Sequence, residues 1–456
     1  MASAGVWRNW AGTVTARPQR FWRPRDTDGV VRAVRLAARH GLRVRAVGGG
    51  HSFTAVAATD GVLLDVGLLA GVEAVLRHPD GTADVTVGAG TRLRDLNRAL
   101  AGLGLAMANL GDIDRQTVAG AVCTGTHGTG ARVGGLSSQV AGLRVITADG
   151  AVHDVDASRE PALFEAARLG LGALGVLVSV TLRVVPAFTL QAREETRPLA
   201  EVLERLDGPD GWVATTDHVD LYWFPFTRRA LVKRNDRVLD APAARAGVAE
   251  RLGSLRRLLD DEVLANGVFE LTNRIAAVVP AAVPTVNAVA ARALSDRTYR
   301  APSAQVFVSP RRVRFREMEY AVPRGALRDV LGEVDAWLRR TREPVPFPVE
   351  IRFAPADDVW LSTAYGRDTA YVAVHQYHRL PHARYFAAVE AVMDAADGRP
   401  HWGKLHGLDA DRLAPRYPRF EEFRRERAAV DPQGMFANAY VDRVLGPAGA
   451  TTRPGG

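Results

Sequence analysis

The sequence predicts an α+β fold arranged in two domains, and three observations lead to this prediction. The chain has 456 residues, which is too long for one simple core. Short strand and helix patterns alternate over roughly the first hundred residues. From about residue 187 onward longer strand patterns replace them, which indicates a second domain built on a larger antiparallel sheet.

The first elements follow local signals for helix ends and strand patterns. Asp28 is expected to cap a helix whose apolar residues keep helical spacing, and Gly41 is expected to end it. Apolar runs then predict three short strands, and a helix that opens with Thr91 follows them. In chain order these elements span residues 43–47, 61–66, 83–90 and 91–104.

The next stretch, residues 105–135, is rich in glycine, threonine and alanine and is predicted to be a loop. A loop of that length is uncommon without a function. Residues 143–155 then have the pattern of a β-hairpin with Asp149 and Gly150 in a type I′ turn. An alternating strand pattern at 175–186 ends the first domain at Pro186.

The second domain is predicted from long alternating strand patterns that are separated by helical ones. The strand candidates span residues 219–224, 311–320, 347–353 and 370–378. Helix patterns lie around residues 250–275, 325–340 and 383–395.

Composition and charge narrow the class of protein. With 47% hydrophobic and 24% charged residues, the chain is typical of a soluble globular protein. The most apolar long stretch, residues 275–294, is interrupted by prolines and by Arg292, so no membrane span is expected. The first residues lack the apolar core of a signal peptide, and the single cysteine, Cys123, suits a reducing compartment, so a cytoplasmic protein is expected. The net charge of +8 comes from arginines scattered among carboxylates, which argues against nucleic-acid binding.

Two glycine-rich loops, residues 48–52 and 120–130, stand out in the first domain. Each presents backbone N–H groups with little side-chain obstruction, as the pyrophosphate of a dinucleotide requires. Neither has the glycine spacing of a dinucleotide fingerprint or of a P-loop. Taken alone, each loop is more consistent with a structural turn than with a ligand site. Three consecutive glycines nevertheless indicate a positive φ or a very close backbone approach.

The two loops taken together with later motifs resemble a known family. VGGGHS (47–52), TVAGAVCTGTHGTG (117–130) and GLGALGVLVSVTLRVVP (170–186) resemble the FAD-binding domain of the vanillyl-alcohol oxidase and p-cresol methylhydroxylase flavoproteins. VEIRF (349–353), HWGKLH (401–406) and DPQGMFANAY (431–440) are similar to the aldonolactone and alditol oxidase group, which includes gulonolactone and arabinonolactone oxidases. The expected organisation is an FAD-binding domain over 10–186, a substrate domain over 187–410, a segment over 411–445 that returns to the FAD-binding domain, and a disordered tail over 446–456.

The resemblance implies that FAD is the cofactor and that His51 is its covalent anchor at the flavin 8α carbon. A neutral imidazole is a competent nucleophile near pH 7. No second attachment is expected, because the position of the second linking cysteine in doubly linked relatives holds Arg115, and Cys123 is expected to be a packing residue. The other residues expected to bind the cofactor are Gly48, Gly49, Gly50, Ser52, Gly111, Asp112, Val118, Gly120, Thr124, Gly125, His127, Gly128, Gly175 and Val176.

Glu350 and Arg352 lie two apart in a strand pattern, so their side chains share one face. From the residues alone, a surface ion pair explains them equally well. The resemblance implies instead that both project toward the reactive edge of the flavin, where Arg352 would stabilise the anionic reduced ring and Glu350 would orient it and accept a substrate hydroxyl.

His375 matches an active-site histidine of the same group, as a base or a hydroxyl ligand, with a core histidine as the alternative. Lys404 matches the lysine of the group's H-W-x-K motif and would hold a substrate oxygen or the flavin. His401 and His406 could suggest zinc, but the remaining ligands are missing from the pattern, so no metal site is expected.

The resemblance therefore implies an FAD-dependent oxidase that takes a hydride from a CH–OH carbon of a polyol, sugar or aldonolactone and passes the electrons to O₂, giving H₂O₂. A dehydrogenase of the same fold with another electron acceptor is the first alternative, and a carbohydrate-binding flavoprotein without catalysis is the second. The small residue Gly111 favours oxygen access to the flavin. Asp112 stands where alditol oxidases have a serine, so the substrate of that group cannot be transferred to this chain.

Overall fold

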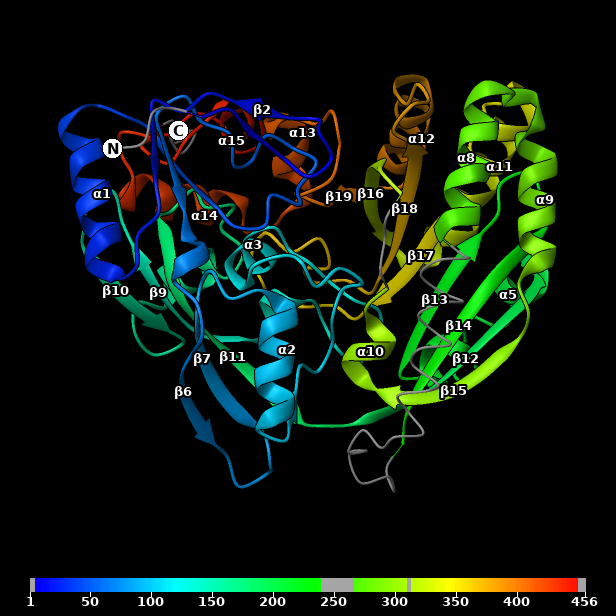
Figure 1. The fold of residues 1–456 in the computed structure, drawn as a ribbon, viewed down its shortest axis with the longest axis horizontal. Helices are drawn as coiled ribbons and strands as arrows, with labels where there is room; N and C mark the ends of the chain where they lie inside the picture. Colours follow the sequence, from blue (N-terminus) through cyan, green and yellow to red (C-terminus); the bar gives the residue numbers. More distant parts are fainter. Residues whose placement is uncertain (1–4, 239–265, 310–312, 450–456) are drawn as a thin grey trace, which may run out of the picture.

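The computed structural model describes residues 5–238, 266–309 and 313–449, and Figure 1 shows two bodies of strands and helices side by side. The first body holds most of the chain as far as β11 (Val176–Pro186), together with the C-terminal helices. The second body holds a large sheet that begins with β12 (Thr189–Pro198). The change of character that the sequence predicts near residue 187 thus coincides with the passage from one sheet to the next.

A small parallel sheet forms one part of the first body. Its strand order is β3-β5-β4 with both pairs parallel, and helix α1 connects the two outer strands, β3 and β4. Helix α1 buries its apolar stripe in the same core as these strands. The elements span β3 (Arg20–Trp22), α1 (Thr27–Arg39), β4 (Val44–Val47) and β5 (Val62–Asp65).

An antiparallel sheet of six strands forms the other part of the first body, in the order β10-β9-β11-β7-β6 with β8 paired to β11. Its strands are β6 (Val72–Arg77), β7 (Ala83–Gly88), β8 (Leu105–Ala106), β9 (Val140–Ile146), β10 (Val152–Asp156) and β11. The helices of this part are α2 (Leu93–Gly102), α3 (Val118–Cys123) and α4 (Pro161–Ala167). A short hairpin of β1 (Trp7–Arg8) and β2 (Thr15–Ala16) precedes all of them.

The second body is an eight-stranded antiparallel sheet with the order β15-β12-β14-β13-β17-β18-β16-β19. Its other strands are β13 (His218–Trp223), β14 (Arg229–Val238), β15 (Arg297–Pro302), β16 (Phe315–Pro323), β17 (Val349–Ala354), β18 (Thr369–Tyr377) and β19 (Arg399–Pro400). Helices α8, α9 and α11 gather at its outer end, at the upper right of Figure 1. Its helices are α5 (Leu199–Glu204), α6 (Trp212–Thr215), α8 (Asn266–Val278), α9 (Val283–Ala293), α10 (Ser303–Phe307), α11 (Leu327–Thr341) and α12 (Ala383–Ala395).

The C-terminal segment returns to the first body, where Figure 1 shows its red helices above the blue strands. The side-chain amide of Asn438 donates hydrogen bonds to the carbonyls of Ala55, Val56 and Ala58. The backbone N–H of Val44 donates to the carbonyl of Met435 at 2.8 Å. The helices of this segment are α13 (Ala410–Leu413), α14 (Phe420–Val430) and α15 (Ala439–Leu445).

Arg45 ties three segments of the first body together. Its side chain is 2% exposed, and its guanidinium donates to the carbonyls of Leu171, Gly172 and Phe436, which lie up to 391 residues away in sequence. Among the described residues no carboxylate lies within ion-pair distance of Arg45, so its direct hydrogen-bond partners are backbone carbonyls. Burial lowers the pKa of Arg45 to about 10, which still leaves it charged at neutral pH.

Several local predictions need correction. Helix α1 is capped by Asp26 rather than Asp28, because the Asp26 carboxylate accepts the Gly29 N–H at 2.7 Å. The hairpin turn is not of type I′, which needs a positive φ at both central residues; Gly150 has a φ of +78° and Asp149 does not. The glycine-rich stretch 105–135 is not a plain loop, because it contains β8 and α3.

Two further predictions lie partly outside the described residues. The helix expected around 250–275 falls there up to residue 265, and α8 is its described part. Residues 450–456 of the expected disordered tail also lie outside. No helix of the described residues is long and apolar enough to cross a membrane.

We expect Arg45→Met to destabilise the protein by about 3 kcal/mol, because it leaves three buried carbonyls without their donor. Urea unfolding followed by circular dichroism measures this. The exposed Arg98 of α2 provides the control, and Arg98→Met should change stability by less than about 0.5 kcal/mol. Equal effects of the two substitutions would contradict the role of Arg45 as a clamp.

Candidate active site

A cavity of about 800 Å³ lies where the first glycine loop meets α3 and the segment before β11. Loop 48–52 forms one side and residues 171–175 another. Of the residues expected to bind a cofactor, those that line this cavity are Gly48, Gly49, Gly50, His51, Ser52, Gly120, Thr124 and Gly175. The two glycine loops of the sequence therefore meet at one cavity.

Two features of the backbone require glycine within residues 48–50. A Cβ atom on Gly48 would lie 2.0 Å from Oγ1 of Thr117, the residue that caps α3 through the N–H of Gly120. Gly50 has a φ of +66°, which L side chains rarely adopt. The loop backbone thus packs directly against the start of α3, and no side chain of these glycines fills the cavity.

A second, polar cavity of about 690 Å³ continues the first. The residues that line both cavities are His51, Ser52, Gln116 and Thr124. Gly111, Asp112 and His127 line the second of these two cavities but not the first. A glycine-walled cavity that leads into a polar one fits an elongated ligand such as FAD, with its pyrophosphate against the loop backbone and its flavin head in the polar part.

His51 stands at the junction of the two cavities. Its Nδ1 atom is buried and has no hydrogen-bond partner among the described residues, and its ring stacks on Trp10 with ring centroids 5.8 Å apart. Burial, helped by the charges of Arg92 and Lys404, lowers the pKa of His51 to about 4. His51 is therefore neutral at pH 7, as a nucleophile toward the flavin must be.

One wall of the polar cavity is a face of the eight-stranded sheet. Glu317 and Glu319 alternate along β16 and so point to the same side. The register places Glu319 opposite Ala373 of β18, and Ala373 opposite Glu350 of β17. Each of the three glutamates is at most 5% exposed, and the small side chain of Ala373 leaves open the space between Glu319 and Glu350.

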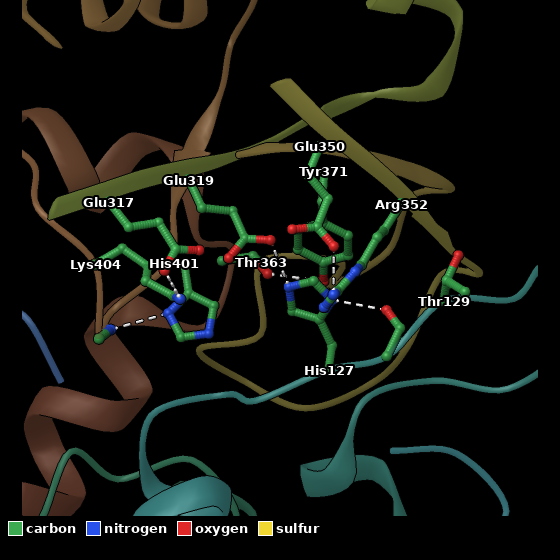
Figure 2. Close-up of polar contacts among 12 residues, drawn as sticks. His127, Thr129, Glu317, Glu319, Glu350, Arg352, Thr363, Tyr371, His401 and Lys404 are labelled. Atoms are coloured by element: carbon green, nitrogen blue, oxygen red, sulfur yellow. Dashed lines mark hydrogen bonds and ion pairs between the residues drawn. The ribbon is translucent and has the colours of Figure 1, made fainter. Parts of the chain in front are cut away.

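Each of these glutamates has a basic side chain as its partner, as Figure 2 shows. Lys404 Nζ lies 2.5 Å from Oε2 of Glu317. His127 Nε2 lies 3.0 Å from Oε1 of Glu319. Arg352 forms a close ion pair with Glu350, whose carboxylate also accepts the hydroxyl of Tyr222 at 2.8 Å. Each carboxylate of the cavity wall is thus paired with a basic side chain.

Arg352 has two further acidic neighbours. Asp112 Oδ2 lies 3.5 Å from its Nη2, and Asp220 Oδ1 lies 3.4 Å from its Nε. Burial would lower the pKa of Arg352, but the attraction of Glu350, Asp112 and Asp220 raises it well above the usual value. Burial also raises the pKa of Asp220 to about 6, despite the opposing charge of Arg352. Arg352 therefore remains a fixed cation throughout the physiological pH range.

His375 lies beside this row and lines a separate, more apolar cavity that also touches Glu350. Its Nε2 atom is 3.5 Å from Oε1 of Glu317 and 4.0 Å from Oε2 of Glu350. The ring packs edge-on against Phe315, with centroids 5.1 Å apart. His375 is thus close to the glutamates but is not on the wall of the polar cavity itself.

The structure brings the expected residues Glu350, Arg352 and Lys404 together with His51 around the polar cavity. Four expected cofactor residues lie elsewhere. Val118 and Val176 are buried at the starts of α3 and β11, Gly125 packs on Leu169, and Gly128 lines a neighbouring cavity.

Sequence reasoning missed Glu317 and Glu319, as well as Asp220 and Tyr222. A signal for the first pair was present, because two glutamates at alternate positions of a predicted strand share one face. Asp220 and Tyr222 carry the same alternation in β13. Only the tertiary pairing of β13, β17, β18 and β16 brings the two alternations close together. Glu317 and Glu319 line the polar cavity, whereas Asp220 and Tyr222 line a neighbouring one and contact Arg352 and Glu350.

Two family models match the chain. Residues 180–444 match the D-arabinono-1,4-lactone oxidase model, which covers more than half of the chain. Residues 18–156 match the FAD binding domain model. The first match covers the second body and the C-terminal segment that returns to the first body, and the second match lies within the first body.

Curated relatives match over nearly their full length. An L-gulono-1,4-lactone dehydrogenase of Mycobacterium tuberculosis is 41% identical over 442 residues, covering 97% of this chain and 99% of that protein. An L-gulonolactone oxidase of Bos taurus is 32% identical over 445 residues, covering 96% and 98%. A D-arabinono-1,4-lactone oxidase of Saccharomyces cerevisiae is 35% identical over 237 residues, covering 52% and 44%.

Solved structures agree in fold. A cholesterol oxidase from Brevibacterium sterolicum, as a His121Ala mutant, superposes with a TM-score of 0.74 at 19% identity and covers 96% of both chains. At that identity the likeness concerns the fold alone. The matches in sequence, with the cavity that fits FAD, show that the chain belongs to the D-arabinono-1,4-lactone oxidase family of FAD-dependent oxidoreductases.

Proposed function

We propose that this protein oxidises a CH–OH group of an aldono-1,4-lactone with covalently bound FAD. The observation that carries the proposal is the fixed pair of Glu350 and Arg352 on the wall of a polar cavity that begins at His51. The names of the relatives, which are lactone oxidases and a lactone dehydrogenase, support the lactone as substrate class.

FAD, when bound, supplies an acceptor for the hydride that leaves the carbinol carbon. Arg352 would hold a positive charge beside that acceptor, and Glu350 and Tyr222 would fix the direction of the guanidinium. Lys404, held by Glu317, would donate a hydrogen bond to an oxygen of the lactone. His375 lies behind the cavity wall, so the hydroxyl proton would reach it by way of the carboxylate of Glu317 or Glu350, which lie 3.5 Å and 4.0 Å from its Nε2 atom.

The proposal has two forms, an oxidase and a dehydrogenase, which differ in the electron acceptor. Gly111 supports molecular oxygen as the electron acceptor, because it lines the polar cavity without a side chain. A Cβ atom on Gly111 would lie 3.1 Å from the carbonyl oxygen of His127, so the space beside Gly111 is narrow. A different acceptor is supported by the relative of 41% identity, which is named a dehydrogenase. We favour oxygen, because the small residue leaves a route to the flavin.

The proposal is tested by mixing the flavin-loaded protein with L-gulono-1,4-lactone or D-arabinono-1,4-lactone without oxygen. We expect the flavin absorbance to bleach in one turnover and to return rapidly, with H₂O₂, when air is admitted. Bleaching that persists for many seconds in air supports the dehydrogenase form. Failure of every lactone, sugar and polyol to bleach the flavin would reject catalysis in favour of a binding protein.

His51→Ala should remove the covalent bond to the flavin and leave FAD held by the glycine loops alone. Acid precipitation followed by washing distinguishes covalently bound flavin from non-covalently bound flavin, because only covalent flavin stays with the precipitated polypeptide and colours it yellow. His153→Ala, at an exposed ion pair with Glu160, is the matched control and should keep its flavin through the wash. Covalent flavin in His51→Ala would refute the anchor.

Arg352→Ala should slow reduction of the flavin by lactone about 100- to 1000-fold, which is typical for loss of one group that stabilises developing charge. Arg352→Lys keeps the charge but not the planar guanidinium and should lose less. Stopped-flow absorbance gives both rates. Arg144→Ala, at an exposed ion pair with Asp154, serves as the control. If the flavin of Arg352→Ala were reduced as fast as the flavin of Arg144→Ala, Arg352 would be excluded from the reaction.

A further inference from the structure

The buried pair of His127 and Glu319 raises the question of where its proton lies. The His127 ring is 4% exposed and lies in the polar cavity that His51 and Arg352 also line. Its Nδ1 atom is 2.9 Å from the carbonyl oxygen of Gly128, and its Nε2 atom is 3.0 Å from Oε1 of Glu319. A carbonyl and a carboxylate are both hydrogen-bond acceptors.

A neutral imidazole carries one proton and can satisfy only one of these acceptors, leaving a lone pair against the other. An imidazolium donates to both. Burial alone would raise the pKa of Glu319, but the attraction of His127, with smaller contributions from His401 and Lys404, holds it below its usual range. The geometry therefore carries the assignment: with Nδ1 directed at a carbonyl and Nε2 at a carboxylate, only a ring with two protons donates to both.

The surroundings keep the His127 ring in this position. A Cβ atom on Gly128 would lie 2.2 Å from Oδ1 of Asn109, so the segment that carries the accepting carbonyl is tightly packed. The ring stacks on Tyr371 with centroids 3.5 Å apart and planes 14° apart, and an aromatic face favours a cation. The Tyr371 hydroxyl is itself hydrogen-bonded to Thr363 at 3.0 Å.

A metal ion is the other way to place positive charge here, because ligand atoms of His127, Glu319 and His401 lie within 4.8 Å of one another. His401 argues against it. Its Nδ1 atom accepts the N–H of Gly403 at 3.0 Å, and burial lowers its pKa to about 4, so it is neutral. The proton of neutral His401 is then on Nε2, which leaves no lone pair for a metal.

We propose that His127 is a permanent imidazolium whose charge neutralises Glu319, so that no unpaired anion remains beside the flavin head. The inference rests on the proposed function, because reduction places negative charge on the flavin, and a bare carboxylate in the same cavity would oppose it. His127 acts through the charge balance of the cavity, in addition to the fixed cation of Arg352. The groups that face it are Glu319, Tyr371 and His401, from three separate segments.

The protonation state is tested by nitrogen NMR of the flavin-loaded, histidine-labelled protein from pH 6 to pH 9, with His127→Gln to assign the signal. We expect both ring nitrogens of His127 to carry protons throughout, whereas His401 shows one. Glu319→Gln should let His127 lose its proton within this range. A neutral His127 at pH 7, or one divalent metal ion per chain by elemental analysis, would overturn the proposal.

The charge balance is tested with sulfite, an anion that adds to oxidised flavin. We expect His127→Gln to bind sulfite about 10- to 100-fold more weakly than the unchanged protein at pH 9, as the loss of one nearby unit charge predicts. The double variant His127→Gln, Glu319→Gln should recover most of the affinity, because it removes both charges. His153→Gln, at the exposed pair with Glu160, should match the unchanged protein.

A purely structural role for His127 predicts no recovery in the double variant, so the absence of recovery would overturn the charge balance. Unchanged sulfite binding in His127→Gln would also overturn it. If His127→Gln fails to fold, Glu319→Gln and the NMR of the unchanged protein still decide the charge state. If no lactone reduced the flavin, the proposed function would be rejected. The NMR and sulfite measurements need no substrate, so their outcome is independent of that result.

Discussion

The polar cavity depends on one constraint, which is that a buried carboxylate must be matched by a cation. Glu317, Glu319 and Glu350 lie on one face of the large sheet, and their partners come from three different places. His127 comes from the first body, Lys404 from the segment after β19, and Arg352 from β17 itself. The contact between His127 and Glu319 therefore also joins the first body to the large sheet at the site.

This arrangement separates two tasks along a continuous cavity. The glycine-walled part offers backbone atoms and no charged glutamates, which suits the phosphate-bearing half of a dinucleotide. The polar part offers fixed charges, which suit a reaction that moves charge onto the cofactor. His51 lies at the boundary, where burial keeps its imidazole neutral and nucleophilic.

The sequence predicted the two-domain α+β fold and the family, because those features rest on local patterns and specific motifs. It predicted Glu350 and Arg352 on one face from their spacing alone. It did not predict that Glu319 is the partner of His127 or that Glu317 is the partner of Lys404. These residues meet only because strands that are far apart in the sequence pair in the large sheet. The capping by Asp26 and the turn at Gly150 were also missed, since neighbouring residues offer equivalent local signals.

The return of the C-terminal segment sets an order of events during synthesis. Asn438 binds the backbone around Val56, a residue of the glycine-walled cavity, and Phe436 accepts from Arg45 of the same wall. These contacts form only after nearly the whole chain of 456 residues has left the ribosome. The cofactor cavity is consequently completed late in synthesis, once the segment around Phe436 and Asn438 has reached the first body.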